Sequence, residues 1–558
     1  MLYVPGKRLI VGLLILSSSI AVNVYSAQVI TNTVGKTMPS DAAPLERQTY
    51  RFLLQEPTTL DISIAVYQAG GAVFSFEGLT RLDENNELTA AAADSWEVSD
   101  DGHQWTFHLR RGAKWSDGRS VTAHDFVYTY VRIVDPASAN VNASLYYDIK
   151  GAQAFNQGQL KDADKLGLEA IDDYTFVITT ERPCPYIPLI ASFPTSGPVP
   201  SWQVEKYGPR WTEAENCVSN STFKLDSWLH GTKFEFVLDP LYNGPHKAYL
   251  ERIVGIFTNT DLMAGGTLAY ENNEVDYQLL TPVDLPRISS HPQLRHELDI
   301  SPDFETNYLF FDPNVAPFGD VRVRRAIAHA IDRELICRVV LQGMAEPAYT
   351  MLPPGFPGYS DGRFDDLQRF DVKRARELLA EAGYANGRGF PRQELWINRI
   401  DNQITAQALQ QMLKQNLNIN LDIRVVERSA YRAAQFQWQI PMSLIQYHYD
   451  YPDPNNMLSM VWHSQPKGYS RHPWANKSFD ALVDQAASEM DPDRRIGLYQ
   501  KAEKILAEDA GAAFIYYDKI ASLRKPWIKG IKRDKNGFFP FWGNNTGYMD
   551  VYIGSNIE

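Results

Sequence analysis

Cysteine is scarce in this chain, with three residues in 558. They are Cys184, Cys217 and Cys337, and no two of them form a C-x-x-C pair. This scarcity excludes a small disulfide-rich scaffold and a zinc ribbon, because both need clustered cysteines. Cys337 lies in a segment with helical periodicity and is predicted to be a buried free thiol.

Motifs of catalysis and cofactor binding are also missing. The sequence has no G-x-G-x-x-G after a strand, no G-x-x-x-x-G-K-[ST], no H-E-x-x-H and no G-x-S-x-G. Paired carboxylates such as Asp172-Asp173 stand in polar stretches typical of solvated turns. We therefore predict a protein that is not an enzyme, with no cofactor, no metal and no catalytic residue. An aromatic content of 12% leaves open a secreted hydrolase that uses acidic residues in an aromatic cleft.

Positive charge is in deficit, with 54 Lys and Arg against 67 Asp and Glu and a formal net charge of −13. No cluster of basic residues stands out. Binding to nucleic acid requires such a cluster, so nucleic acid is not a predicted partner. A hydrophobic content of 44% and a charged content of 22% are ordinary for a soluble globular protein.

Long apolar runs are absent except near the start, where Lys7 and Arg8 precede an apolar run that ends at Leu16. This basic, then apolar, then small-residue pattern predicts a secretory signal peptide over residues 1–27. A membrane anchor is the alternative, but the run is shorter than the ~20 apolar residues that a spanning helix needs. No cysteine lies near the cleavage point, which argues against a lipoprotein. The expected location is the periplasm of a Gram-negative cell.

An oxidising compartment permits a disulfide between Cys184 and Cys217. Both residues stand in loop-like settings, Arg-Pro-Cys-Pro and Glu-Asn-Cys. We treat this bridge as a possible disulfide, with two free thiols as the alternative.

The length is too great for one compact core, so two or more lobes are expected. Short strands alternate with helices, a pattern typical of α/β lobes with a parallel-containing sheet. One long helix is expected over Val321–Leu341. The expected organisation is a signal peptide over 1–27, an extended lead-in over 28–47, a first lobe over 48–303 with a subdomain at about 76–188, a second lobe over 304–514, and a return to the first lobe over 515–558.

The segment Trp115–Pro136, WSDGRSVTAHDFVYTYVRIVDP, carries the most information. Thr122 and Asp125 form a capping-box pair at a helix start, and apolar residues recur at helical spacing from Phe126 to Val134. From the residues alone, this is a turn and an amphipathic helix without catalytic chemistry. As a string, it closely resembles the signature segment of the extracytoplasmic solute-binding proteins of family 5, which serve oligopeptide ABC importers.

Further blocks resemble the same family and occur in the same order along the chain. They are Leu60-Asp61, Phe76-Glu-Gly-Leu79, Ala93-Asp-Ser-Trp96, Phe318-Gly-Asp-Val-Arg-Val-Arg324 and Leu378-Leu-Ala-Glu-Ala-Gly383. The resemblance implies an α/β, two-lobed periplasmic binding protein of the large three-subdomain type II form, with a ligand cleft between the lobes. It also implies a monomeric receptor that closes on a peptide or peptide-like solute by a hinge movement. The receptor would then deliver the solute to an ABC permease and ATPase complex in the inner membrane.

The segment Tyr447–Pro454, YHYDYPDP, follows an apolar run that would emerge from a sheet. Peptide binders of the family carry a similar aromatic-x-x-Asp run, in which the aspartate pairs with the α-ammonium group of the ligand. The resemblance therefore implies that Asp450 is the ammonium partner, with Tyr447 and Tyr449 beside it. A carboxylate in a closed cleft binds a cation through charge-assisted hydrogen bonds. A capping aspartate in an Asx-Pro turn is the alternative.

Main-chain groups of residues 64–68 are implied to pair with an extended peptide as though it were an added strand. Val66 and Gln68 are the expected contacts, within two residues of register. Two positions depart from the peptide binders: Asn142 stands where they often carry a tyrosine, and Leu444 stands near the place of an arginine that clamps short peptides. These departures put ordinary di- or tripeptide selectivity in doubt and leave open a non-peptide ligand, such as a metal chelate, an oligosaccharide or an opine.

Three histidines form the best candidate metal set, namely His448, His463 and His472. Their spacing is loose, and the last two stand in loops rich in Trp, Ser and Pro. A structural or surface role is therefore preferred.

Overall fold

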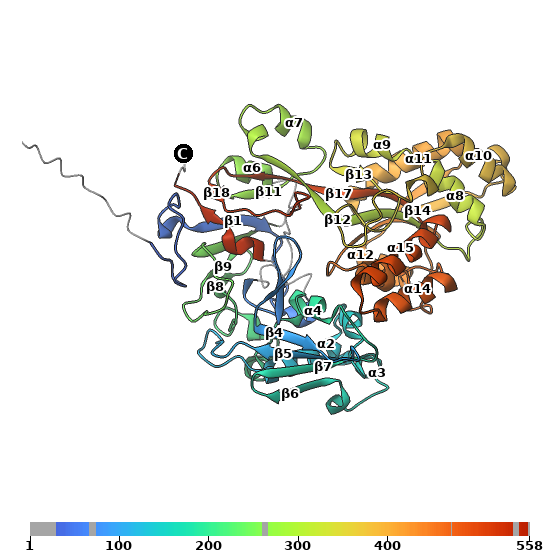
Figure 1. Cartoon of the computed structure of the whole chain (residues 1–558). Coiled ribbons are helices and arrows are strands. Elements are labelled where there is room, and N and C mark those ends of the chain that lie inside the picture. Colours follow the sequence, from blue (N-terminus) through green and yellow to red (C-terminus); the bar gives the residue numbers. More distant parts are fainter. Residues whose placement is uncertain (1–29, 66–73, 259–265, 470, 539–545, 556–558) are drawn as a thin grey trace, which may run out of the picture.

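The computed structural model describes residues 30–65, 74–258, 266–469, 471–538 and 546–555. The predicted signal peptide and the predicted contacts Val66 and Gln68 lie outside the described residues. Long strands join two groups of elements that lie side by side in Figure 1. We call the elements β1–β11 with β18 and β19 the first lobe, and the elements β13–β16 with α8–α15 the second lobe.

A mixed sheet runs through both lobes. Its pairing order begins in the second lobe with β15 (Leu421–Val425), β14 (Gln393–Ile397) and β16 (Met442–His448). It passes through β12 (Leu298–Phe311) and β17 (Ala512–Arg524), with β13 (Ala345–Pro347) beside β17. It ends in the first lobe with β11 (Tyr277–Leu279), β1 (Thr49–Leu54), β10 (Arg252–Phe257), β9 (Lys233–Leu238) and β8 (Phe223–Leu229).

The crossing strands β12 and β17 have 14 and 13 residues and pair antiparallel across both lobes. Their register shifts between Pro302 and Thr306, where the strands pass from one lobe to the other. Such a bulge bends a strand and loosens its pairing locally. A second register shift follows between Asn307 and Tyr308, so the sheet that joins the two lobes has two irregularities close to the junction.

Both faces of the second-lobe sheet are covered by helices. One face packs on α8 (Val321–His329), α10 (Val372–Glu381) and α11 (Gln403–Leu417). The other face packs on α12 (Arg428–Phe436), α14 (Lys477–Ser488) and α15 (Pro492–Glu508). Alternate residues of β16 point into the two cores, because side chains along a strand face opposite sides. This is the α/β layering that the sequence predicts.

The first lobe carries a smaller antiparallel sheet of β4 (Ala93–Val98), β5 (Gln104–Leu109), β7 (Thr175–Thr179) and β6 (Leu168–Asp172). Helix α2 (Ala123–Val134) packs on it, as Figure 1 shows. The predicted capping pair is confirmed, since the Thr122 N–H donates to Asp125 Oδ2 at 2.8 Å. Phe126 and Tyr130 are fully buried, with ring centroids 6.0 and 5.4 Å from that of Phe176.

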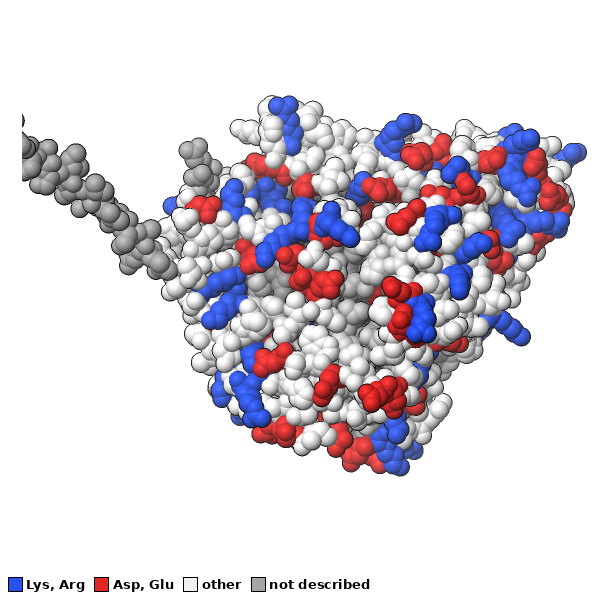
Figure 2. Space-filling view, in the orientation of Figure 1, with Lys and Arg blue, Asp and Glu red and all other residues white. Residues whose placement is uncertain are grey.

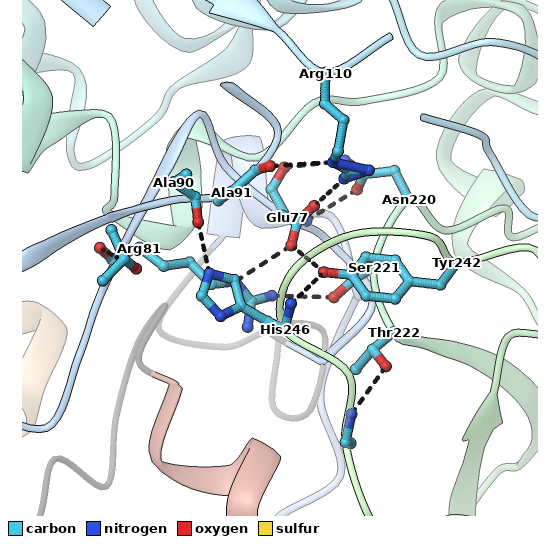
Figure 3. A network of polar contacts seen from close by, with 12 residues as sticks. Glu77, Arg81, Ala90, Ala91, Arg110, Asn220, Ser221, Thr222, Tyr242 and His246 are labelled. Carbon is cyan, nitrogen blue, oxygen red and sulfur yellow. Dashed lines mark hydrogen bonds and ion pairs between the residues drawn. The ribbon is translucent and has the colours of Figure 1, made fainter. Parts of the chain in front are cut away.

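A buried polar network gives the Phe76–Leu79 block a structural role in the first lobe (Figure 3). The Glu77 carboxylate lies 2.7 Å from Arg110 and 3.8 Å from Arg81, and it accepts from Tyr242 Oη at 2.6 Å. Burial alone would raise the pKa of Glu77, but the charges of the two arginines bring that pKa below its ordinary value. Glu77 therefore ties together three chain segments that are distant in sequence.

Cys184 and Cys217 are free thiols in the structure, which is the second of the two alternatives that the sequence leaves open. They are held in separate surroundings. The Cys184 carbonyl accepts from Trp105 Nε1 at 2.9 Å, whereas the Cys217 N–H donates to the Glu213 carbonyl at 2.8 Å. Burial raises the pKa of both thiols, that of Cys217 to about 12, so neither is a reactive thiolate. Cys337 is free and buried, as predicted.

The predicted helix over Val321–Leu341 is interrupted. Helix α8 ends at His329, α9 covers Arg333–Leu335, and a π-helical turn covers Ile336–Val340. The break has a local cause, because the Asp332 carboxylate accepts from the Leu335 N–H at 3.0 Å and starts a new helix.

Candidate functional site

Asp450 lies just beyond the C-terminal end of β16. This strand is an interior strand of the sheet, with β14 on one side and β12 on the other. Its carboxylate accepts hydrogen bonds from Tyr447 Oη at 2.9 Å and from Asn456 Nδ2 at 3.1 Å. Its N–H donates to Asn456 Oδ1 at 2.9 Å, so main chain and side chain are both fixed. The aspartate is half-buried. A half-buried carboxylate in a fixed orientation is a suitable acceptor for a cation.

Tyr447 is buried and lies beside this carboxylate. Burial raises the pKa of its hydroxyl well above the ordinary value, and the charge of Asp450 raises it further, so the hydroxyl stays protonated and donates. The guanidinium of Arg471 lies 4.9 Å from the centroid of the Tyr447 ring. A carboxylate and a guanidinium thus both lie next to one buried tyrosine.

The predicted neighbour Tyr449 lies in an aromatic cluster at the junction of the lobes. Its ring centroid is 5.5 Å from that of Phe304 and 5.8 Å from that of Phe356. Between the two tyrosines, His448 points to Asp303 on the crossing strand β12, with 3.1 Å between Nε2 and Oδ1. Burial lowers the pKa of His448, but Asp303 and then Glu305 raise it to about 9. His448 therefore carries a positive charge at neutral pH.

Tyr146 of the first lobe lies within electrostatic reach of Asp450. Burial raises the pKa of Tyr146 well above its ordinary value, Tyr130 raises it further, and the charge of Asp450 adds to both effects. The Tyr146 hydroxyl is 2.7 Å from Ser196 Oγ. The charge of Asp450 is therefore felt by a buried tyrosine of the other lobe.

Asn142, at the position where the sequence departs from peptide binders, is also buried in the first lobe. It lies beside Asn140, whose Nδ2 donates to the Ser63 carbonyl at 2.7 Å. Ser63 belongs to the short helix α1 (Ile62–Ala65), which leads into the segment expected to contact the ligand main chain. The first two residues of that segment are therefore helical.

A hollow of about 360 Å³ lies next to α1 on the outside of α2. Its size suits a small ligand, but neither Asp450 nor Tyr447 is among its lining residues. Its one cation is already engaged, since Arg132 donates to both oxygens of Asp61 at 2.8 and 2.7 Å. The lining residues are Ile64, Tyr128, Val131, Arg132, Asp135, Ala137 and Ser138. We therefore place the candidate site at Asp450.

The three histidines of the candidate metal set have different partners. His448 pairs with Asp303, His463 lies 3.2 Å from Asp484, and His472 Nε2 lies 3.0 Å from Tyr308 Oη. In the part of the chain that the structure describes, no group of three or more His, Cys, Asp or Glu is arranged to hold a metal ion. Within those same residues, no helix combines the length and apolar character that a bilayer crossing requires.

Sequence reasoning missed Asn456 and Arg471. Asn456 lies in a π-helical turn after the aromatic run, and Arg471 lies in a loop. No local sequence pattern points to either residue, because tertiary packing brings Asn456 next to Asp450 and Arg471 next to Tyr447.

Comparison with known proteins gives concordant results. The profile of bacterial extracellular solute-binding proteins, family 5 (middle region), matches residues 87–469. A probable deoxycholate-binding periplasmic protein, YgiS of Escherichia coli, is 33% identical over 462 residues, 82% of this chain and 85% of that protein. The periplasmic oligopeptide-binding protein OppA of Salmonella typhimurium is 31% identical over 465 residues, 82% of this chain and 84% of that protein. The structure of the murein tripeptide-binding protein MppA of Escherichia coli has a TM-score of 0.76 at 28% identity and covers 92% of this chain and 100% of its own.

Proposed function

The chain belongs to family 5 of the bacterial extracellular solute-binding proteins, and we propose that it is the receptor of an ABC importer for free-amine peptides or peptide-like solutes. The receptor captures its ligand between the lobes, closes on it by a hinge movement and delivers it to the membrane permease. The relatives OppA and MppA are named for binding oligopeptides and a murein tripeptide, which supports a peptide ligand.

The observation that carries this proposal is the fixed carboxylate of Asp450. Tyr447 and Asn456 both donate hydrogen bonds to it and so fix its orientation. An α-ammonium group placed there gains charge-assisted hydrogen bonds inside a closed cleft. We further propose that Tyr447 and Tyr449 line the amine end. Val66 and Gln68 then pair with the peptide main chain.

Calorimetric titration with a library of free-amine tripeptides, and with the same library N-acetylated, tests this function. We expect Asp450→Asn to weaken free-amine binding by ~1.5–3 kcal/mol, the range for a hydrogen bond to a charged group. Wild-type protein should bind the acetylated library poorly. Asp173→Asn is the matched control, because this carboxylate is 65% exposed and lies in the first lobe. Equal affinity for both libraries would refute amine recognition.

A steroid carboxylate is a second candidate ligand, because YgiS is named for probable deoxycholate binding. Such a ligand has no amine for Asp450. Its carboxylate would instead suit the guanidinium of Arg471, which lies over the ring of Tyr447. The same variant separates the two candidates. Asp450→Asn would leave deoxycholate binding unchanged or strengthen it, whereas it weakens peptide binding.

The proposed setting is the periplasm, supported by the signal-peptide pattern at residues 1–27 and by the periplasmic relatives. N-terminal analysis of protein from osmotic-shock fluid should find a start near residue 27 or 28. The receptor is proposed to be monomeric, with lobes at 48–303 and 304–514 and a return at 515–558. It performs no chemistry, so a peptide incubated with it should be recovered intact.

A further inference from the structure

We propose that Glu305 and Asp518 share one proton across the crossing strands, and that this proton stabilises the junction of the lobes in the arrangement seen here. Glu305 lies on β12 and Asp518 on β17, the two strands that join the lobes in Figure 1. A proton at this place goes beyond the proposed function and depends on it only in that the lobes rotate about these strands. Its presence can be measured without any peptide.

Carboxyl groups gather at the junction where strand pairing lapses. At the first register shift between β12 and β17, residues 303–305 stand opposite Asp518 alone. The side chains of Asp303 and Glu305 are 12% and 15% exposed, and Asp518 is mostly buried. Three of the four residues in this gap are thus carboxylic acids that are largely removed from water. Carboxyl groups held so close together resist simultaneous ionisation.

Each of the two β12 carboxylates has a cation beside it. His448 Nε2 lies 3.1 Å from Asp303 Oδ1, and His448 is charged at neutral pH because its pKa is raised to about 9. Arg399 Nη1 lies 3.9 Å from Glu305 Oε1. Asp303 thus has a close charged partner, whereas the ion pair of Glu305 is long.

Asp518 has a neutral donor and a second carboxyl group as neighbours. Asn307 Nδ2 donates to Asp518 Oδ2 at 3.2 Å, and Glu305 forms a side-chain hydrogen bond with Asp518. A hydrogen bond between two carboxyl groups requires a proton on one of them, because an ionised carboxylate only accepts. Burial raises the pKa of Asp518 well above its ordinary value, and the charges of Glu305 and then Asp303 raise it further. The pair therefore carries one proton and one negative charge.

Charged groups on β13 and α9 complete the surroundings of Asp518. Lys519, which follows it on β17, pairs with Glu346 of β13 at 2.6 Å. On the α9 side, burial raises the pKa of the Cys337 thiol to about 12, with Glu334 and then Asp518 adding to the effect, so the thiol is neutral. In the part of the chain that the structure describes, no Lys, Arg or His forms an ion pair with Asp518. The titratable and charged groups around the pair are Asp303, His448, Arg399, Arg333, Glu334, Cys337, Glu346 and Lys519.

The shared proton joins the strands where main-chain pairing does not. With the proton in place, Glu305 and Asp518 attract each other across the gap, and without it two negative charges repel there. An arrangement that separates the two groups returns Asp518 to an ordinary pKa of about 3.9 and so binds the proton less tightly. The arrangement seen here is therefore favoured at low pH. It loses this advantage as the pH rises from that ordinary value through the raised pKa of Asp518.

Infrared spectroscopy of the protein without peptide tests whether the proton is there. A protonated carboxyl group has a C=O stretching band that carboxylates lack. At pH ~6, above the ordinary pKa of Asp and Glu, Asp518→Asn should lose the absorbance of one carboxylic acid relative to wild type. Glu305→Gln should lose the same band, because it removes the partner that shares the proton.

Asp299→Asn is the matched control on β12. Asp299 pairs with Arg524 at 3.5 Å, so this variant should keep the full band. Glu503, whose pKa burial raises to about 8, contributes equally to all these proteins and cancels in the differences. Circular dichroism must show that each variant is folded, and Glu305→Gln decides the matter if Asp518→Asn is not. A band of wild-type strength in the folded variants overturns the shared proton.

Hydrogen exchange without peptide tests whether the proton acts on the junction. Between about pH 5 and 8, protection at residues 303–305, corrected for the intrinsic exchange rate, should fall by up to about tenfold per pH unit, because opening releases one proton. His448, with a pKa of about 9, keeps its charge over most of this range. Asp518→Asn has no proton to release, so its protection should lack this dependence.

Wild-type protection that does not change with pH overturns the coupling, and so does an equal change in Asp518→Asn. Both measurements are made without ligand. Failure of the shared proton therefore leaves the comparison of free and acetylated peptides untouched, and failure of amine recognition leaves the infrared band and the exchange profile untouched.

Discussion

At the scale of single residues, the Glu77 and Asp450 carboxylates lie in different surroundings. Glu77 is fully buried and lies beside two arginines, so its charge is paired within the first lobe and stabilises it. Asp450 is half-buried and is oriented by the neutral donors Tyr447 and Asn456. The first arrangement stabilises the fold, whereas the second fixes the orientation of a carboxylate that is only partly buried.

His448 gives a prediction about pH. Its ordinary pKa of about 6.5 is raised to about 9 in the folded protein, because Asp303 and Glu305 outweigh the effect of burial. A raised pKa means that the folded state favours the proton. The stabilisation is fully present below about pH 6.5 and is lost as the pH rises through about 9.

We expect the free energy of unfolding to fall by about 1–2 kcal/mol between pH 6.5 and 9.5, after allowance for the partial exposure of the ring. Urea denaturation at a series of pH values measures it. His448→Gln cannot titrate and should remove this part of the pH dependence. The same slope in wild type and variant would contradict the charged state of His448.

At the scale of elements, local patterns predicted most of the fold. Helix α2 with its capping pair and the β/α alternation of the second lobe follow from periodicity and turn residues. The length of the crossing strands does not follow from the local sequence, because β12 extends back to Leu298 through the polar residues Asp299 and Asp303. Strand pairing there is set by the partner β17 and not by the local sequence.

The candidate site was predicted less completely. Asp450 and Tyr447 are predicted through the resemblance of their segment to peptide binders, and a hydrogen bond joins them in the structure. Asn456, Arg471 and Tyr146 could not be found, because their proximity depends on the way loops and lobes pack. The choice between a disulfide and two free thiols at Cys184 and Cys217 could not be made for the same reason, since compatible loop settings say nothing of the distance between two thiols.

Glu77 supports a prediction at this scale, because it joins elements and not neighbours. Glu77→Gln leaves Arg81 and Arg110 buried without their counter-charge (Figure 3). We expect the free energy of unfolding to fall by ~3–5 kcal/mol, the usual cost of breaking a buried ion pair. Urea denaturation at pH 7 measures this change.

Glu97→Gln is the matched control. Glu97 lies on β4 in the same lobe and pairs with His108 at 3.4 Å, but its side chain is 72% exposed. An exposed pair contributes ~0–1 kcal/mol, so this variant should be close to wild type. Equal destabilisation by the two variants would mean that the network does not depend on the Glu77 charge.

At the scale of the whole molecule, charge gives little guidance to function. Basic and acidic side chains are interspersed over the face shown in Figure 2, and no field of one sign covers a lobe. The informative asymmetry is mechanical. The lobes share one sheet at the crossing strands, so a rotation between them must be absorbed by those strands.

This geometry predicts where ligand binding slows hydrogen exchange. The pairing of β12 with β17 is interrupted between Pro302 and Thr306, the place where a rotation of the lobes must be absorbed. A tripeptide that holds the lobes closed should therefore increase protection at residues 303–305 and at Asp518 on the facing strand. The sheet of β4–β7 should not change, because it moves as part of a rigid lobe.

Exchange measured by mass spectrometry with and without saturating tripeptide decides the matter. At a hundredfold excess over the dissociation constant, the ligand should also stabilise the folded protein by ~2.7 kcal/mol. Global stabilisation alone would protect all strands that exchange by complete unfolding, whereas hinge closure adds protection at the interruption under conditions far from unfolding. Protection spread evenly over both sheets, with no excess at residues 303–305, would mean that ligand binds without rotation about the crossing strands.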